Sequence, residues 1–432
     1  MEIFHDYEVG ENCLLIDINF SSKPELNAEL SELNGLVHAA NWQISATVCA
    51  KRSLPDPKYF CGSGKLDEIK KIIDNNQIDL VVFNHAITPS QERNIEKALN
   101  CKVIDRTRLI LEIFSQRAQT HEGKLQVELA QLNYVATRLV RGWTHLERQK
   151  GGIGMRGGPG ETQLELDRRM LRQKIAQIEK RLEKVKKQRA LSRTARQKNA
   201  VPTIAFVGYT NAGKSTLFNK LSGAQVLAKD QLFATLDPTL RKVIIPKLGE
   251  VVLSDTVGFI RNLPHNLVEA FHATLEEAIE ADLLVHVIDY ADEHHRAYIE
   301  QVHLVLEQIH AADKPIIQVY NKIDRLEDVK AHIIYHKDKP ADVYLSAQTG
   351  QGIQFLYEAV AKYFNQQWLK GVLVLSTKHA KVRAELYQLG AVEKETISDS
   401  GEYQLALHIA KSDFDEICAH NKLELIAKFS HH

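Results

Sequence analysis

Long apolar runs are absent from this sequence of 432 residues. No stretch approaches the ~18 consecutive apolar residues that a membrane-spanning helix needs. The opening MEIFHDYEVG carries acids and lacks the apolar centre of a secretory signal peptide. We therefore expect a cytoplasmic protein without a membrane span, with partial attachment to membranes left open.

Cysteine is also scarce, and its spacing predicts no cross-linked structure. The five cysteines (Cys13, Cys49, Cys61, Cys101 and Cys418) include no C-x-x-C pair, and the 19 histidines show no metal-ligand spacing. Neither a disulfide framework nor a zinc site is therefore expected. The hydrophobic content of 44% is ample for packed cores in about two to four domains.

The net charge is zero, because 55 basic side chains balance 55 acidic ones. The distribution is nevertheless uneven. From Arg168 to Lys198, thirteen residues are Lys or Arg and only Glu179 and Glu183 are acidic. Such a segment predicts a polyanionic partner, above all a nucleic acid. A solvated basic helix face is the alternative that charge alone leaves open.

Up to about residue 122, short apolar runs alternate with helical patterns. The runs are CLLIDINF, ISATVCAKR, IDLVVFN and CKVID, and they begin at positions 13, 44, 78 and 101. This alternation is typical of a small α/β domain with a mostly parallel sheet. We expect such a domain over residues 1–122.

Two series of apolar residues at heptad spacing follow. The first is Leu125, Leu129, Leu132, Ala136 and Leu139, and the second is Leu164, Leu171, Ile175, Ile178, Leu182 and Val185. This spacing places the apolar side chains on one seam of each helix. Because a glycine-rich segment joins the two series, we expect an antiparallel helical hairpin over residues 123–200. A plain linker is the alternative.

The glycine-rich segment GGIGMRGGPG, Gly151 to Gly160, is called the tongue below. Its six glycines leave few side chains to obstruct the close approach of an RNA. A second helix from about residue 165 to 189 would be roughly 37 Å long and would carry the tongue away from the rest of the protein. A disordered connector is the alternative. We expect RNA contacts from the glycines and basic residues in and beside the tongue: Arg148, Lys150, Gly151, Gly152, Gly154, Arg156, Gly157, Gly158, Gly160, Arg168, Arg169 and Arg172.

A phosphate-binding loop lies in IAFVGYTNAGKST. Its pattern G-x-x-x-x-G-K-S, Gly208 to Ser215, stands between a buried strand and a helical pattern. The glycines allow successive backbone N–H groups to face a phosphate at a helix N-terminus. We expect Lys214 to span the β- and γ-phosphates and the Ser215 hydroxyl to bind Mg²⁺.

Three further motifs predict that the nucleotide is GTP. D-x-x-G, Asp255 to Gly258, ends a second apolar strand, where the carboxylate can hold the Mg²⁺ shell and the Gly258 N–H can meet the γ-phosphate. N-K-x-D, Asn321 to Asp324, ends a third strand, and its last carboxylate can accept two hydrogen bonds that guanine donates and adenine does not. Ser346-Ala347 ends a fourth strand. We expect a P-loop GTPase domain over residues 201–368.

The whole chain resembles the HflX family of ribosome-binding GTPases, relatives of the translation-factor GTPases. Besides the four motifs, the resemblance lies in the block from Lys102 to Tyr134, in the tongue and the helix after it, and in FATLDPTLR from Phe233 to Arg241. One departure is visible. Two glycines, Gly157 and Gly158, precede Pro159 where we expect one, so the length of the tongue differs from the family pattern.

The resemblance implies further site residues. By likeness to the Thr-Leu-x-Pro pattern of related GTPases, Thr235 is the switch-I threonine that joins Ser215 on Mg²⁺; Thr239 is the competitor. Lys214, Thr235 and Gly258 are expected to be catalytic. The expected GTP-binding residues are Gly208, Tyr209, Thr210, Asn211, Ala212, Gly213, Lys214, Ser215, Thr216, Phe233, Ala234, Thr235, Asp255, Thr256, Val257, Gly258, Asn321, Lys322, Ile323, Asp324, Ser346 and Ala347.

The group that orients the attacking water is not evident. Phe259 directly follows D-x-x-G, where many GTPases have a glutamine for this task. Either another group aligns the water, or turnover is slow until a partner rearranges the site. Asn211 resembles the asparagine with which potassium-activated GTPases hold a monovalent cation, so K⁺ is a candidate beside Mg²⁺.

The two ends of the chain add less. GSGK, Gly62 to Lys65, lacks the first glycine and the final hydroxyl of a P-loop, so we interpret it as a turn into a helix. ATP binding by this domain, claimed in the family, stays open. Over residues 369–432, alternating strand and helix patterns predict an α+β domain of ferredoxin-like type that docks RNA or protein.

The resemblance also implies a function. It predicts a GTPase that binds GTP and GDP, acts as a monomer on the ribosome, and contacts mainly large-subunit rRNA. Its expected task is to separate stalled or idle ribosomes into subunits, especially under stress. Two other classes remain open: a signalling switch with a protein effector, and a nucleic-acid remodelling NTPase.

Overall fold

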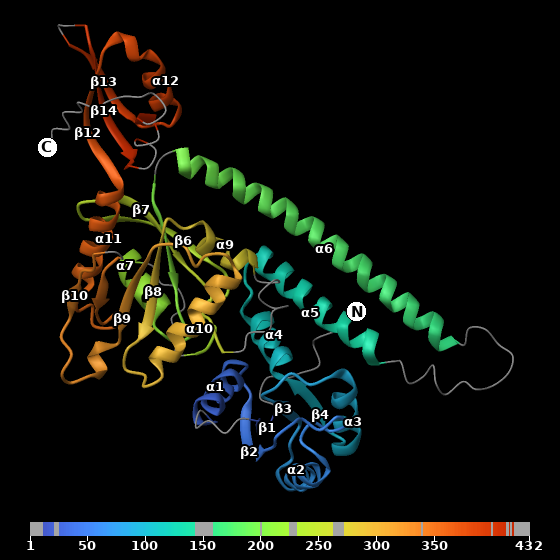
Figure 1. Cartoon of the computed structure of the whole chain (residues 1–432). Coiled ribbons are helices and arrows are strands. Elements are labelled where there is room, and N and C mark those ends of the chain that lie inside the picture. The colour runs from blue at the N-terminus through green and yellow to red at the C-terminus, as the bar shows by residue number, and fades with distance from the viewer. Residues whose placement is uncertain are drawn as a thin grey trace.

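The computed structural model describes residues 12–20, 26–142, 159–198, 201–223, 231–261, 272–337, 340–398, 401–411, 414 and 417–418. Within these ranges the chain forms three β-sheets and a long helical hairpin (Figure 1). The predicted fold class is confirmed: a P-loop GTPase domain follows a small α/β domain and a helical hairpin, and precedes a small α+β domain. None of the described helices is both long and apolar enough to cross a membrane.

The N-terminal sheet has the strand order β2-β1-β3-β4, and all of its neighbours are parallel, as predicted. Its strands are β1 (Asn12–Asn19), β2 (Gln43–Lys51), β3 (Leu80–Phe83) and β4 (Lys102–Asp105). Its helices are α1 (Leu26–Ala39), α2 (Ser63–Asn76), α3 (Pro89–Leu99) and α4 (Arg106–Arg117).

Local signals set the starts of these helices. Thr88 forms a capping box before α3, and Pro89 occupies the first turn. The Asp105 carboxylate accepts from the Arg108 N–H and caps α4. GSGK is a turn into α2, as interpreted from the sequence. Gly62 has φ 88°, and a Cβ there would lie 2.2 Å from Nη1 of Arg52.

The helical hairpin consists of α5 (His121–Gly142) and α6 (Pro159–Lys198), which lie side by side (Figure 1). Its seam is the one predicted from the heptads, with Leu125, Leu132, Leu171, Ile178 and Leu182 buried in a cluster of their own. At 40 residues, α6 spans roughly 60 Å and exceeds the expected 165–189. Proline is well suited to the first turn of a helix, and the following sequence is rich in helix-forming residues.

Most of the tongue lies outside the described residues. This applies to Arg148, Lys150, Gly151, Gly152, Gly154, Arg156, Gly157 and Gly158. The expectation that Gly160 belongs to the tip loop is wrong, because this glycine is the second residue of α6.

Buried charges attach α5 to the N-terminal sheet. Arg138 forms ion pairs with Glu92 of α3 and, at 2.6 Å, with Asp105 at the end of β4. The Tyr134 hydroxyl donates to the same aspartate at 3.0 Å, and the guanidinium stacks over the tyrosine ring. The base of the hairpin is therefore fixed to the N-terminal domain.

The GTPase domain contains a seven-stranded sheet of order β10-β11-β9-β8-β5-β7-β6, in which β6 and β10 are the antiparallel edges. The strands are β5 (Thr203–Val207), β6 (Thr239–Ile245), β7 (Gly249–Asp255), β8 (Leu283–Asp289), β9 (Ile316–Asn321), β10 (His332–Ile334) and β11 (Asp342–Tyr344). The described helices are α7 (Lys214–Ser222), α9 (His272–Glu280), α10 (His295–Gln308) and α11 (Ile353–Gln367). The parallel strands bring their carboxyl ends, and the four motifs, to one edge.

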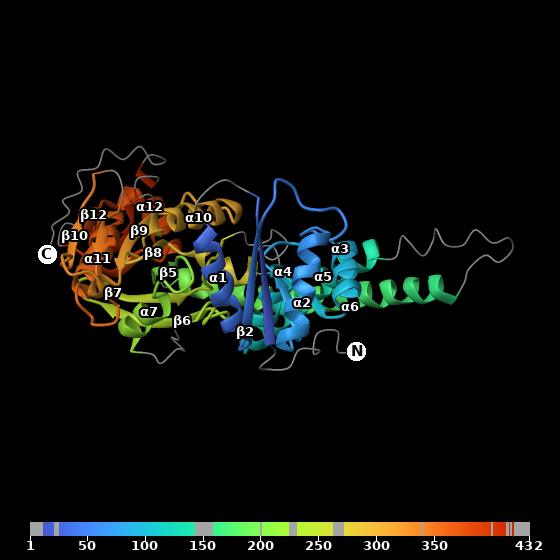
Figure 2. The ribbon, with the colours of Figure 1, turned by 90° about the horizontal axis from the view of Figure 1, so that it is seen from below.

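The N-terminal and GTPase domains share one apolar core. One face of the N-terminal sheet packs under α2 and α3. The other face packs on α1 and α4, and this layer continues through Phe233 and Phe259 to α9 and α10 of the GTPase domain. Figure 2 shows α1 lying next to the GTPase domain. A shared core of this kind makes the two domains one packed unit.

The C-terminal sheet has the order β12-β14-β13, with antiparallel neighbours. Its elements are β12 (Trp368–Leu375), α12 (Ala380–Gln388), β13 (Val392–Ile397) and β14 (Tyr403–Ala410). Side chains of α12 such as Leu386 pack on one face of the sheet. The order agrees with three strands of a ferredoxin-like sheet, so the predicted α+β domain is confirmed.

We predict that Ile178→Ala loosens the hairpin. This side chain is 3% exposed in the seam, so its truncation should destabilise the pairing of α5 with α6 by about 2–4 kcal/mol. Amide hydrogen exchange of both helices measures the loss. Met170→Ala, on the same helix but 52% exposed, is the control and should change exchange little. Equal protection in the two variants would contradict the assignment of the seam.

Candidate nucleotide-binding site

The phosphate-binding loop connects β5 to α7 and depends on two glycines. Gly208 has φ 148° and Gly213 has φ 96°. A Cβ at Gly208 would lie 2.3 Å from the Val287 carbonyl oxygen, and a Cβ at Gly213 would lie 2.2 Å from Nδ2 of Asn321. No other residue fits these positions, because the conformation is strained and the space is filled.

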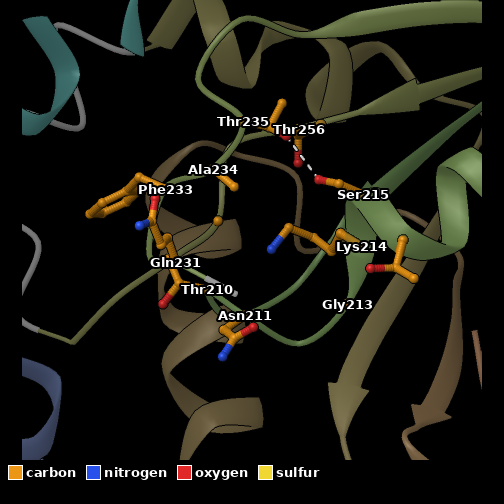
Figure 3. A pocket seen from close by; sticks show the side chains of 12 residues that line it. Thr210, Asn211, Gly213, Lys214, Ser215, Gln231, Phe233, Ala234, Thr235 and Thr256 are labelled. Carbon is orange, nitrogen blue, oxygen red and sulfur yellow. Dashed lines mark hydrogen bonds between the residues drawn. The ribbon is translucent and has the colours of Figure 1, made fainter. Parts of the chain in front are cut away.

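Lys214, the first residue of α7, is buried beneath this loop. Its ammonium donates to the carbonyl oxygens of Gly208 at 3.1 Å and Tyr209 at 2.8 Å. Burial lowers the pKa of Lys214 to about 8, an effect that the nearby Asp255 carboxylate opposes. The ammonium points across the pocket between the P-loop and the segment that contains Thr235 (Figure 3).

Three oxygen groups converge beside Lys214. The Ser215 hydroxyl donates to Oδ2 of Asp255 at 2.7 Å. It lies 2.8 Å from the Thr235 hydroxyl (Figure 3). Thr239, the competitor from the sequence, instead begins β6 and pairs with Asp255 in the sheet. The geometry therefore supports Thr235 as the residue that joins Ser215.

This cluster fits a hard divalent cation. Hydroxyl and carboxylate oxygens are the ligands that Mg²⁺ prefers. Oδ1 of Asp255 is buried and, among the described residues, has no hydrogen-bond partner. Burial raises the pKa of Asp255, while the Ser215 hydrogen bond and the Lys214 charge lower it. A bound cation would supply the partner that this oxygen lacks.

The base-recognition motifs meet the P-loop through Asn321, the last residue of β9. Its amide donates to the Ala212 carbonyl at 2.9 Å, and its carbonyl accepts from the Ala347 N–H at 2.9 Å. Lys322 forms a 2.6 Å ion pair with Asp289. The exposed Asp324 follows in a 3-10 turn, η2 (Ile323–Arg325), at the same edge of the sheet.

The space for the phosphates is narrow. We call residues 231–237 switch I and residues 255–261 switch II. A cavity of about 50 Å³ lies between them and the P-loop. The expected residues that line it are Thr210, Asn211, Gly213, Lys214, Ser215, Thr216, Phe233, Ala234, Thr235, Thr256 and Gly258. Val257 is buried in the shared core instead.

The backbone of Phe259 joins switch II to the P-loop. Its N–H donates to the Gly208 carbonyl at 3.1 Å, and its carbonyl accepts from the Thr210 N–H at 2.7 Å. The phenyl ring is 1% exposed and packs into the shared core. The side chain at this position therefore cannot orient an attacking water.

Switch I rests on the junction between α4 and α5. The Asp237 carboxylate accepts from the N–H groups of Gln119 at 2.8 Å and Thr120 at 2.9 Å, and from the Thr120 hydroxyl at 2.5 Å. The rings of Phe114 and Phe233 meet edge-on with centroids 4.7 Å apart. The segment that includes Thr235 thus touches the helix that begins the hairpin.

The sequence did not predict three residues of the N-terminal domain that contact the switches or the P-loop. Arg117 of α4 donates at 2.8 Å to Gln231, which lines the phosphate cavity. Glu32 and Arg106 contact Tyr209 and switch II from the N-terminal domain. The ring of Tyr209 lies in this domain contact, although we expected it among the GTP-binding residues. Its contacts join residues up to 177 positions apart, which no local motif can reveal.

The described part of the predicted RNA surface lies on α6. Arg169 and Arg172 are exposed, and Arg168 is half-buried. Farther along, Lys174 pairs with Glu128 of α5 at 2.7 Å, so some of the basic charge is used within the hairpin. The exposed arginines remain available for phosphate groups.

We predict that Asp324→Asn changes the choice of base. An amide suits the altered edge of xanthine, whereas guanine loses its double acceptor, so GTP affinity should fall about 100-fold or more while XTP binding appears. Equilibrium titration with labelled GTP and XTP measures both. Asp328→Asn, farther along the same loop, is the control. An unchanged preference for GTP would place base recognition elsewhere.

Comparison with known proteins agrees with this site. Family models match residues 27–115 (GTP-binding GTPase N-terminal), 117–196 (GTP-binding GTPase middle region) and 203–322 (50S ribosome-binding GTPase). GTPase HflX of Escherichia coli K12 is 51% identical over 417 residues, 96% of this chain and 97% of that protein. GTPase HflX of Magnetococcus marinus is 48% identical over 84% of both chains.

Among solved structures, a GTP-binding protein from Sulfolobus solfataricus in complex with GDP is 25% identical. It covers 82% of this chain and 99% of that chain at a TM-score of 0.44. With half of its residues identical to a relative over nearly the full length, and with the nucleotide motifs assembled at one sheet edge, the chain belongs to the HflX family of GTPases, enzymes that hydrolyse GTP.

Proposed function

We propose that this GTPase binds the ribosome, mainly through rRNA of the large subunit, and acts there as a monomer. GTP binding and hydrolysis then drive the separation of stalled or idle ribosomes into subunits, especially under stress. The family model over residues 203–322, described as a 50S ribosome-binding GTPase, supports the choice of partner. The basic face of α6 supports RNA as the contacted molecule.

The observation that best supports the proposal is the contact between switch I and the α4–α5 junction. Asp237 is bound by Gln119 and Thr120 directly before α5 begins, and a Cβ at Gly123 would lie 2.0 Å from Oδ1 of Asp237. A movement of switch I on GTP binding would therefore break these contacts or displace the junction. Since α5 leads to the tongue, the nucleotide state can set how the hairpin meets rRNA.

Each residue of the site has a separate role in binding GTP. Lys214 neutralises the β- and γ-phosphates, the Gly258 N–H meets the γ-phosphate, and Asp324 selects guanine. Ser215 and Thr235 would hold Mg²⁺, with Asp255 beside them. When bound, this cation neutralises charge on the β- and γ-phosphate oxygens. Because Phe259 is buried, another group has to orient the attacking water, and a ribosome that rearranges the switches could supply or position it.

We predict that replacing the tongue leaves GTP binding and intrinsic hydrolysis intact but impairs the action of the protein on the ribosome. A Ser-rich linker in place of Gly151–Gly160 removes the close approach to RNA but touches no residue of the nucleotide site. GTP affinity and intrinsic hydrolysis should stay within about twofold, while ribosome-stimulated hydrolysis and subunit separation fall at least tenfold. Phosphate release and light scattering measure these rates.

The basic helix supplies a matched control for the tongue. Replacing Arg169 and Arg172 with Gln leaves the tongue intact, so it should weaken ribosome binding and lower its salt dependence with a smaller effect on separation. A linker variant that separates ribosomes as fast as the natural protein would show that the tongue is only a connector.

We also propose that K⁺ assists hydrolysis through Asn211, which lines the phosphate cavity. The prediction is faster GTP turnover in potassium than in sodium buffer, and loss of this difference in Asn211→Ala. Steady-state phosphate release at constant ionic strength measures it, with lithium as a further control. Equal rates of the natural protein in both buffers would exclude a potassium role.

A further inference from the structure

Tyr209 of the P-loop makes its polar contacts with the N-terminal domain and switch II. Its hydroxyl hydrogen-bonds the Glu32 carboxylate of α1 and accepts from the Arg261 N–H at 2.9 Å. Its ring stacks on Tyr298 of α10, with centroids 4.2 Å apart and planes 15° from parallel. Burial and the neighbouring Glu32 carboxylate raise the pKa of Tyr209, so the hydroxyl keeps its proton.

Arg106, the first residue of α4, contacts the same part of switch II. It forms an ion pair with Glu32, donates to the Asn84 side chain at 2.8 Å, and donates to the Arg261 carbonyl at 3.2 Å. Both backbone groups of Arg261 are thus bound by side chains. The four residues Glu32, Arg106, Tyr209 and Arg261 are all buried. A buried network of this kind defines one arrangement strongly, because breaking it leaves charged groups without partners.

This arrangement holds switch II where a γ-phosphate has to enter. In a P-loop site the γ-phosphate lies between the lysine and the glycine of D-x-x-G. Here a Cβ at Gly258 would lie 3.0 Å from Nζ of Lys214 and 2.8 Å from Cγ2 of Thr210. Gly258 therefore packs directly against the P-loop. Admission of a γ-phosphate must move switch II away from Lys214, whereas GDP requires no such movement.

We propose that Glu32 and Arg106 are positioning residues of the nucleotide site, contributed by the N-terminal domain, which hold switch II against the P-loop and so favour GDP over GTP. The γ-phosphate and the N-terminal domain then compete for switch II. By linkage, GTP loosens the contact of Glu32 and Arg106 with switch II by the same factor by which this contact weakens GTP binding. The inference rests on GTP binding alone and is independent of the ribosome.

Tyr209→Phe tests the proposal with little change in shape, because it removes the one hydroxyl that joins Glu32 to switch II. Affinity for a non-hydrolysable GTP analogue should rise by roughly tenfold, the size expected for one buried hydrogen bond to a charged group, while GDP affinity stays unchanged. Tyr298→Phe removes a hydroxyl from the stacked partner ring and should change neither affinity. An analogue-to-GDP affinity ratio equal in both variants and the natural protein would overturn the proposal.

A second measurement separates positioning from misfolding. Amide exchange of α1 and the start of α4 should accelerate in the natural protein with the GTP analogue but not with GDP. In Glu32→Gln it should be fast with either nucleotide, with normal protection of α11 as the folding control. Analogue-independent exchange of α1 in the natural protein would contradict the linkage. Neither readout involves ribosomes, so failure of the ribosome proposal would leave this test intact.

Discussion

The burial of residues 109–114 of α4 determines how the N-terminal and GTPase domains pack together. Leu109, Ile110, Leu111, Ile113 and Phe114 are each at most 2% exposed. These residues lie within six consecutive positions, which cover every side of a helix, so this part of α4 is enclosed by the protein. Here it lies between the N-terminal sheet and the GTPase domain, so both domains are packed on one element. Its two polar ends, Arg106 and Arg117, then reach switch II and switch I.

This placement makes the nucleotide site a product of two domains. The P-loop, the proposed cation ligands and the base motifs come from the GTPase domain. The positions of the switches depend on α1, α4 and the α4–α5 junction. The hairpin continues from that junction, so α4, which contacts both switches, is joined through α5 to the tongue. A GTPase domain with the same motifs but without this helix would lose the connection between nucleotide and hairpin.

The sequence predicted those parts of the site that depend on local rules. The P-loop follows from glycine spacing between a strand and a helix, and the base motifs follow from the ends of parallel strands. The hairpin seam followed from heptads, because its contacts repeat along the chain. The start of α6 was placed too late, since the glycine content concealed a proline suited to begin a helix.

The contacts between domains could not be predicted in the same way. Glu32 and Tyr209 lie 177 positions apart, and neither lies in a sequence motif from which its contact with the other could be predicted. The family pattern favoured Thr235 over Thr239 without excluding Thr239. The structure supports this choice, because Thr239 pairs with Asp255 in the sheet and Thr235 lies beside Ser215. The orientation of Phe259 into the shared core likewise depends on packing that no single segment encodes.

Cosedimentation with large ribosomal subunits can show whether the nucleotide state controls the contact of the hairpin with rRNA. The full chain is incubated with GTP, GDP or a non-hydrolysable GTP analogue and centrifuged with purified subunits. The account predicts that the analogue-bound protein pellets with the subunits and that the GDP-bound protein remains mostly in the supernatant. Equal pelleting with both nucleotides would contradict it.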